Sequence, residues 1–144
     1  MKNVGLRVIL SLVIVLVAVL SSAVPVSAAK PQPSSGGTTA SISVSIDWVI
    51  PDYNLFYVSY SWKNYDAYGV NITIVDNNYN QVAGSVTTKF AAKMRSYSYP
   101  YAPVAKSSTF TSPLDTTHSY TVTLKVLGMN GNTIAQTTNT YTPR

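Results

Sequence analysis

The feature that most constrains this chain is a short alternation of apolar and polar side chains near its C-terminal end. Four bulky side chains alternate there with three polar ones: Tyr120, Val122, Leu124 and Val126 against Thr121, Thr123 and Lys125. A period of two is typical of a strand with one buried and one solvated face. The following pair, Asn130 and Gly131, favours a tight hairpin, because a type I′ turn needs positive φ at both central residues. We therefore predict a β-hairpin from strands at 120–126 and 132–142.

The N-terminal residues predict an export signal at 1–29. Lys2 and Arg7 supply a positive start, the run 8–20 is almost entirely apolar, and small residues at 26–29 suit cleavage. The apolar run is short against the ~20 residues that cross a bilayer. We expect cleavage near residue 29, which makes the protein secreted or cell-surface. The alternative is a retained N-terminal anchor, the single way in which we expect contact with a membrane.

The next segment, 30–40, is rich in Pro, Ser and Gly and predicts a flexible tether. One domain follows at 41–144. The chain has no cysteine, so its stability must come from packing, and charged residues make up only 10% of it. Loss of Lys2 and Arg7 with the signal would lower the formal net charge from +5 to +3. Such a small surplus does not indicate a nucleic-acid partner.

The domain is predicted to be all-β. Seven stretches read as strands by their alternation or β-prone composition: 42–48, 55–62, 70–74, 81–87, 104–111, 120–126 and 132–142. Between them, Phe90 and Met94 lie four residues apart, which allows one or two helical turns at 88–95. Pro100 and Pro103 keep the next segment out of a central strand. Short links favour antiparallel pairing, so we predict a single seven-stranded antiparallel two-sheet sandwich.

The order of these features resembles a fibronectin type III domain, within the broader group of immunoglobulin-like sandwiches. Trp62 looks like that family's buried tryptophan of the second strand. Leu114 followed by Tyr120 looks like its leucine-to-tyrosine corner, in which the tyrosine hydroxyl bonds back to nearby backbone. The resemblance covers residues 40–142 in outline. Trp48 falls on the buried side of the 42–48 alternation. The predicted structural core therefore comprises Trp48, Trp62, Leu114 and Tyr120.

Two groups of residues are candidates for chemistry. His118 is the only histidine, and Asp115 with one of many serines could be drawn into a Ser-His-Asp set, but no spacing places them. Asp76, Asn78 and Asn80 have the spacing that opens a calcium loop, but the required glycine and glutamate are missing further on. We expect His118 to be a solvent-facing turn residue and the asparagines to form a hairpin turn. No metal, no cofactor and no enzymatic activity are predicted.

A basic and tyrosine-rich stretch is the predicted binding surface. It contains Lys93 and Arg95 and the alternating Tyr97, Tyr99 and Tyr101. Tyrosines present amphipathic contact area at low entropic cost, as in protein interfaces. The alternative is that they cover a sheet edge or cap the core.

The function that these features favour is a secreted or cell-surface, non-catalytic module for adhesion or binding. Its partner would be an extracellular protein or a glycan, or a second copy of the chain. The alternative is a structural subunit of an extracellular filament or surface layer that assembles by strand addition. Asn71 begins an N-glycosylation sequon on the expected outer face of a strand.

Overall fold

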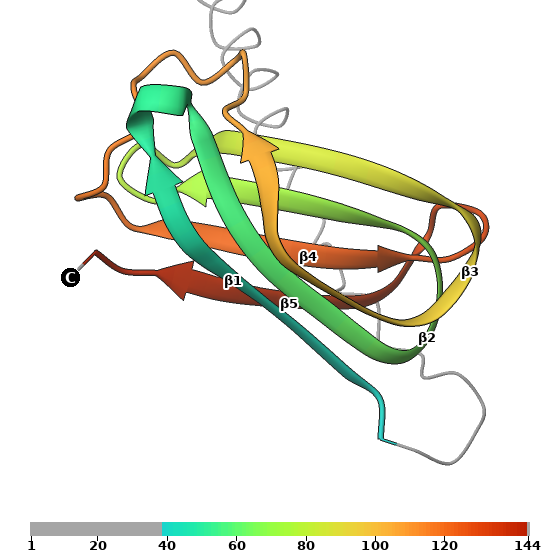
Figure 1. Cartoon of the computed structure of the whole chain (residues 1–144). Coiled ribbons are helices and arrows are strands. Elements are labelled where there is room, and N and C mark those ends of the chain that lie inside the picture. Colours follow the sequence, from blue (N-terminus) through green and yellow to red (C-terminus); the bar gives the residue numbers. More distant parts are fainter. Residues whose placement is uncertain (1–38, 144) are drawn as a thin grey trace, which may run out of the picture.

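The computed structural model describes residues 39–143, and within that range the chain is all-β (Figure 1). Two strands are long: β2 (Leu55–Asp76) has 22 residues and β3 (Gln81–Ala105) has 25. The others are β1 (Ser41–Ile50), β4 (Tyr120–Leu127) and β5 (Thr133–Tyr141), with a single 3-10 turn, η1 (Pro51–Tyr53). The predicted signal peptide and the tether up to residue 38 lie outside the described residues. No helix in residues 39–143 is long and apolar enough to cross a bilayer.

All strand pairs are antiparallel, in the order β1-β2-β4-β5, with β3 also pairing with β2. Residues 55–63 of β2 lie between β1 and residues 96–105 of β3. Residues 69–76 of β2 lie between residues 81–89 of β3 and β4. We call these groups the first and the second half of the sheet; β5 extends the second half by pairing with β4. The two long strands therefore belong to both halves.

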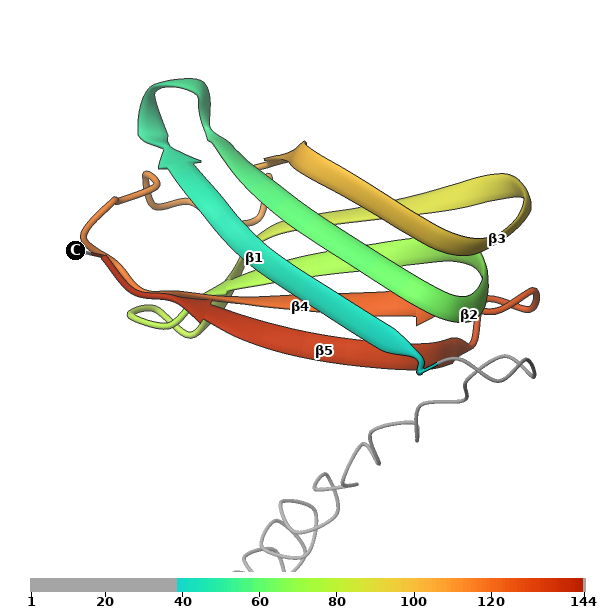
Figure 2. The same cartoon turned by 60° about the horizontal axis from the view of Figure 1, so that its bottom comes forward.

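The sheet curls where β2 and β3 pass from one half to the other. Pairing is irregular from Lys63 to Gly69, and Asn64 adopts a left-handed φ of 61°. A Cβ atom at Gly69 would come within 2.7 Å of the Thr88 carbonyl oxygen, so glycine is required where the strands come so close. The curl brings β1 and the adjoining part of β2 across from β4 and β5 (Figure 2).

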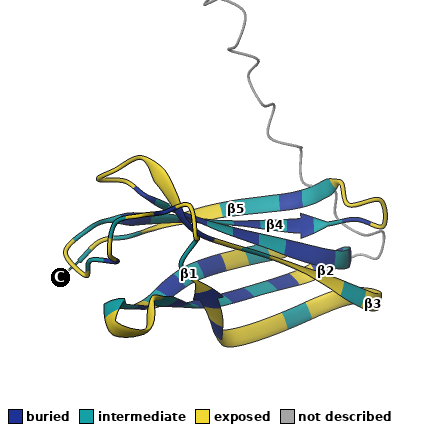
Figure 3. Ribbon diagram, turned by 90° about the horizontal axis from the view of Figure 1, so that it is seen from above, coloured by how far each residue is buried: buried dark blue, intermediate teal, exposed yellow. Residues whose placement is uncertain are grey.

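One apolar core fills the space between the two halves. Its largest fully buried side chains include Phe56, Tyr120 and Leu124, and Trp62 is 2% exposed. The predicted alternation at 120–126 is confirmed, since buried and half-buried residues alternate along β4. Figure 3 shows the buried residues concentrated on β2 and β4, while exposed residues dominate β3 and the turns.

The corner before β4 has the predicted hydrogen bonds. The Tyr120 hydroxyl donates to the Asp115 carbonyl oxygen at 2.9 Å and accepts from the Asp115 backbone N–H at 3.0 Å. Leu114 is buried beside it, at 3% exposure. The core positions predicted at Trp62, Leu114 and Tyr120 are therefore confirmed.

Several predicted element boundaries were wrong. The helical turns expected at 88–95 are part of β3, and the strand expected at 104–111 ends at Ala105. Five strands replace the predicted seven, because β2 and β3 each continue through the bend instead of breaking there. The proline segment belongs to β3 and pairs with β2 on both sides of a register shift at Pro100 and Tyr101. It forms the edge of the first half, where prolines are tolerated.

Candidate functional site

The first notable feature of the surface is Trp48, which the alternation had assigned to the core. It is 51% exposed. Ile46 pairs with Val58 but Trp48 pairs with Tyr57, so Asp47 is an extra residue in β1. This β-bulge reverses the alternation and returns Val49 to the core in place of Trp48. The prediction of a core Trp48 was wrong for that reason.

A second bulge, in β3, places Tyr101 on the same outer side. Val58 pairs with Ala102 and Tyr60 with Tyr99, so two residues of β3 stand opposite Ser59. Tyr101 has a φ of 59°, in the left-handed region. Within residues 39–143, the other residues with positive φ are three asparagines and Gly131, types that tolerate this conformation. Tyr101 is therefore the one bulky side chain there held in a strained backbone conformation.

The two bulges bring three aromatic rings together on the outer side of the first half. The rings of Trp48 and Tyr101 are stacked, with centroids 4.9 Å apart and planes at 30°. Tyr57 meets Trp48 edge to face at 6.1 Å. Tyr101 is 53% exposed, so the cluster keeps much of its area in contact with solvent.

A short polar network lies directly beside these rings. The Asp47 carboxylate accepts hydrogen bonds from Ser59 at 2.6 Å and from Ser45 at 3.4 Å. The Ser59 hydroxyl in turn accepts a bond from the Tyr101 backbone N–H at 3.3 Å, so it links both bulges. We call the combined surface the aromatic face; its members are Trp48, Tyr57, Tyr101, Asp47, Ser45 and Ser59.

The other two tyrosines of the predicted binding stretch point to the opposite side of β3. Tyr97 and Tyr99 pair with Trp62 and Tyr60, whose side chains lie in the core. The ring centroid of Tyr97 is 5.2 Å from that of Trp62. The ring of Tyr99 stacks on that of Tyr60, with centroids 5.8 Å apart. Burial, reinforced by these tyrosine neighbours, raises the pKa of the Tyr60 hydroxyl to about 12. The structure therefore separates Tyr101, on the outer side, from two tyrosines that cover the core.

Lys93 and Arg95 lie where β3 bends between the two halves. The Lys93 ammonium is 3.6 Å from the Asp66 carboxylate, and both side chains are about half exposed. Such a surface ion pair contributes little to stability. The structure does not bring these two cations into the aromatic face.

His118 is not the solvent-facing residue that the sequence predicted. Its Nδ1 is 2.8 Å from a carboxylate oxygen of the fully buried Asp76, and its Nε2 is 3.7 Å from Asp115. The other oxygen of Asp76 accepts backbone N–H bonds from Asn78 and Tyr79, which confirms the predicted hairpin turn.

The Asp115 carboxylate is itself engaged within the corner. The hydroxyl and the backbone N–H of Thr117 both donate to it, which holds the pKa of Asp115 below its usual range. Both nitrogens of His118 thus face carboxylates, and no serine hydroxyl within residues 39–143 is hydrogen-bonded to its ring. This arrangement stabilises the turns and does not resemble a nucleophilic site.

The sequon residue Asn71 lies in the part of β2 that pairs with β3 on one side and with β4 on the other. Its side-chain amide donates to the Thr87 hydroxyl at 2.8 Å, and its carbonyl oxygen accepts from Thr73 at 3.1 Å. Glycosylation at this position stays a prediction, and it would require these side-chain bonds to open.

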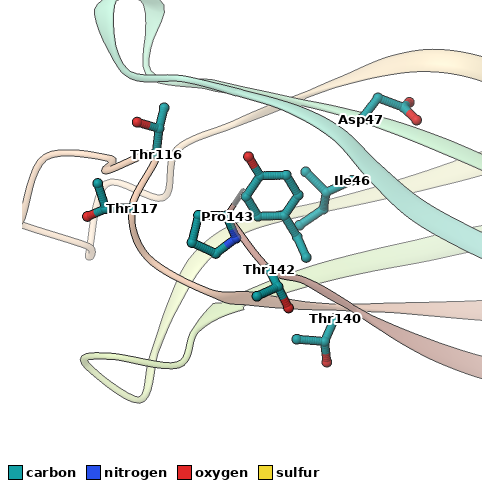
Figure 4. Close-up of a pocket in the computed structure, with 8 residues that line it drawn as sticks. Ile46, Asp47, Thr116, Thr117, Thr140, Thr142 and Pro143 are labelled. Carbon is teal, nitrogen blue, oxygen red and sulfur yellow. The ribbon is translucent and has the colours of Figure 1, made fainter.

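A large hollow lies between β1, the corner before β4 and the end of β5. It measures about 860 Å³ and is lined by Ile46, Asp47, Thr116, Thr117, Thr140, Tyr141, Thr142 and Pro143. Figure 4 shows Thr116 and Thr117 on one side and Asp47 on the other, with the Asp47 carboxylate directed away from the threonines. Its hydroxyl-rich lining brings no acid–base pair together.

The metal-ligating side chains do not cluster in the described part of the chain, where no group of three or more acidic or histidine residues could hold an ion. Comparison with known proteins gives no match to a family model, a curated protein or a solved structure. The site must therefore be interpreted from its own geometry.

Proposed function

We propose that the curled sheet is a two-sheet sandwich of the fibronectin type III kind. In this interpretation β1, 55–63 and 96–105 form one sheet, and 69–76, 81–89, β4 and β5 form the other, which restores seven strand segments. The hydrogen-bonded corner at Tyr120 and the buried Trp62 support it, because both are features of such sandwiches.

We further propose that the protein is a secreted or cell-surface, non-catalytic module that binds a protein or a glycan through its aromatic face. The supporting observation is the left-handed Tyr101. A bulky residue in this conformation is strained by about 1–2 kcal/mol. Strained residues persist at binding and switch sites, where function requires the geometry. Here the strain presents an aromatic ring to solvent instead of burying it.

The predicted signal at 1–29 supports export, and the engagement of His118 with two carboxylates supports a non-catalytic role. The filament alternative envisages strand addition to a neighbour's sheet by an N-terminal segment, and strand 42–48 docked on its own sheet counts against it. That strand pairs with β2 of its own chain from Ser41 to Ile50, so it gives the filament alternative no support.

Binding to the envelope fraction of the producing cell tests the proposal. The protein recovered from the exporting cell is compared with Trp48→Ala, Tyr101→Ala and a control, Met129→Ala. Met129 is 73% exposed in the β4–β5 turn, away from the aromatic face. Since buried aromatic anchors commonly contribute more than 2 kcal/mol, each face variant should bind about tenfold more weakly or worse. Unchanged binding by folded Trp48→Ala and Tyr101→Ala proteins would refute the proposal.

A further inference from the structure

The aromatic face carries polar groups that are not satisfied by the protein. The indole N–H of Trp48 and the hydroxyls of Tyr57 and Tyr101 form no hydrogen bond within residues 39–143. Each Asp47 oxygen accepts one hydrogen bond from a serine and retains further acceptor capacity. Donors and acceptors thus surround an apolar ring surface at one place.

From this arrangement we infer that the ligand of the aromatic face is an uncharged glycan chain; this inference rests on the proposed function. A pyranose ring has C–H groups on its faces, which pack on aromatic rings, and hydroxyls on its rim, which both donate and accept. The rings of Trp48 and Tyr101 can pack against the C–H groups of the sugar. Asp47 and the free phenol and indole groups can accept from and donate to its hydroxyls.

Other ligand classes match this surface less well. An anionic ligand would approach the Asp47 carboxylate, and the face contains no lysine or arginine to offset the repulsion. A lysine or arginine side chain would use Asp47 and the ring faces but would leave the phenol and indole donors without acceptors. A wholly apolar ligand would cover the phenol and indole donors without offering them an acceptor.

The surface continues beyond the rings as a strip of serines, which gives space for more than one sugar unit. A shallow hollow of about 450 Å³ lies on the serines of β1, β2 and β3, and Tyr99, Pro100 and Asn139 also contribute to its lining. The hydroxyls of Ser43 and Ser61 are 2.8 Å apart, so one of the two hydrogens remains available to a ligand. Ser98, on the adjoining strand, forms no hydrogen bond with its side chain within residues 39–143. We therefore expect a chain of linked sugars to extend from the aromatic rings along this strip.

Retention on insoluble neutral polysaccharides, namely cellulose, chitin and mannan, tests the inference, with soluble oligosaccharides of the same sugars as competitors. The protein recovered from the exporting cell should be retained by at least one of them, and Trp48→Ala or Tyr101→Ala should weaken retention about tenfold or more. Met129→Ala should bind like the unchanged protein. Asp47→Asn keeps the shape and removes the charge, so it should weaken binding only a few-fold. High salt, about 1 M NaCl, should have little effect, since the ligand is uncharged.

Three results would overturn the inference. The first is retention on neutral polysaccharide that survives the double variant W48A/Y101A. The second is abolition of retention by Asp47→Asn or by salt, which would indicate a cationic ligand. The third is absence of retention on every neutral polysaccharide while envelope binding still depends on Trp48, which would leave the proposed function standing with a protein partner. Loss of the Trp48 dependence in the envelope assay would instead refute the proposed function itself.

Discussion

Replacing Tyr101 by glycine or by alanine separates its strained backbone from its ring. Both variants lose the stacking contact with Trp48, worth about 0.5–1.5 kcal/mol, so this loss cancels when the two are compared with each other. They differ in the Cβ atom, which makes a left-handed backbone unfavourable by about 1–2 kcal/mol. Glycine normally destabilises a strand by about 0.5–1 kcal/mol relative to alanine. We therefore expect Tyr101→Gly to be more stable than Tyr101→Ala, by roughly 0.8 kcal/mol from the middle of these ranges and by at most about 1.5 kcal/mol.

The same pair of substitutions at Ser98 provides the control, because Ser98 is exposed in the same strand and has no positive φ. There the order should invert, with Ser98→Ala the more stable by about 0.5–1 kcal/mol. Urea unfolding followed by tryptophan fluorescence measures all four free energies of unfolding. If Tyr101→Ala is as stable as Tyr101→Gly, the left-handed conformation is not imposed by the fold, and the argument from strain fails.

The remaining predictions concern two buried tyrosines. Tyr120→Phe removes the hydroxyl that is hydrogen-bonded to both backbone groups of Asp115, so it should lower the free energy of unfolding, measured in urea, by about 1–3 kcal/mol. The control Tyr141→Phe should change it by less than about 0.5 kcal/mol. Equal effects of the two substitutions would show that the corner bonds are not stabilising. The raised pKa of Tyr60 means that the folded protein binds more protons than the unfolded chain between pH 10 and about 12, so stability should fall through that range. Ultraviolet titration should show less tyrosine ionisation near pH 12 in Tyr60→Phe than in the unchanged protein, and identical titration curves would contradict the assignment.

The parts of the fold that depend on local patterns could be predicted from the sequence. The alternation at 120–126 placed Tyr120 correctly, and the hairpin after it forms between β4 and β5 as expected. The corner hydrogen bond followed from a resemblance carried by Leu114 and Tyr120. These features need only a few neighbouring residues, so a short window of sequence contains the necessary information.

The parts of the fold that depend on the partner strand could not be predicted from the sequence. Trp48 lies two residues after Ile46, so a regular alternation places both side chains on the same face of the strand. Only the consecutive apolar pair that follows, Val49 and Ile50, indicates that the alternation shifts. Whether a bulge forms at Asp47 is decided by the register with β2, which no local pattern specifies. The aromatic face was missed for this reason, since it is assembled by two bulges in strands that are distant in the sequence.

The same reasoning explains the error at residues 88–95. Phe90 and Met94 have a spacing that suits a helix, but the ring of Phe90 stacks on Trp62, 5.6 Å away. Contact with the core can override a weak local preference. His118 was misplaced similarly, because its partner Asp76 is 42 residues away in the sequence.

The passage of β2 and β3 through both halves has a mechanical consequence. Each half takes some of its strand segments from β2 and β3, so we expect the two halves to unfold together. A load applied at Trp48 passes from β1 to β2 through their shared hydrogen bonds, and β2 continues into the second half, where it pairs with β4. We therefore expect the described domain to resist force applied at Trp48 as one unit.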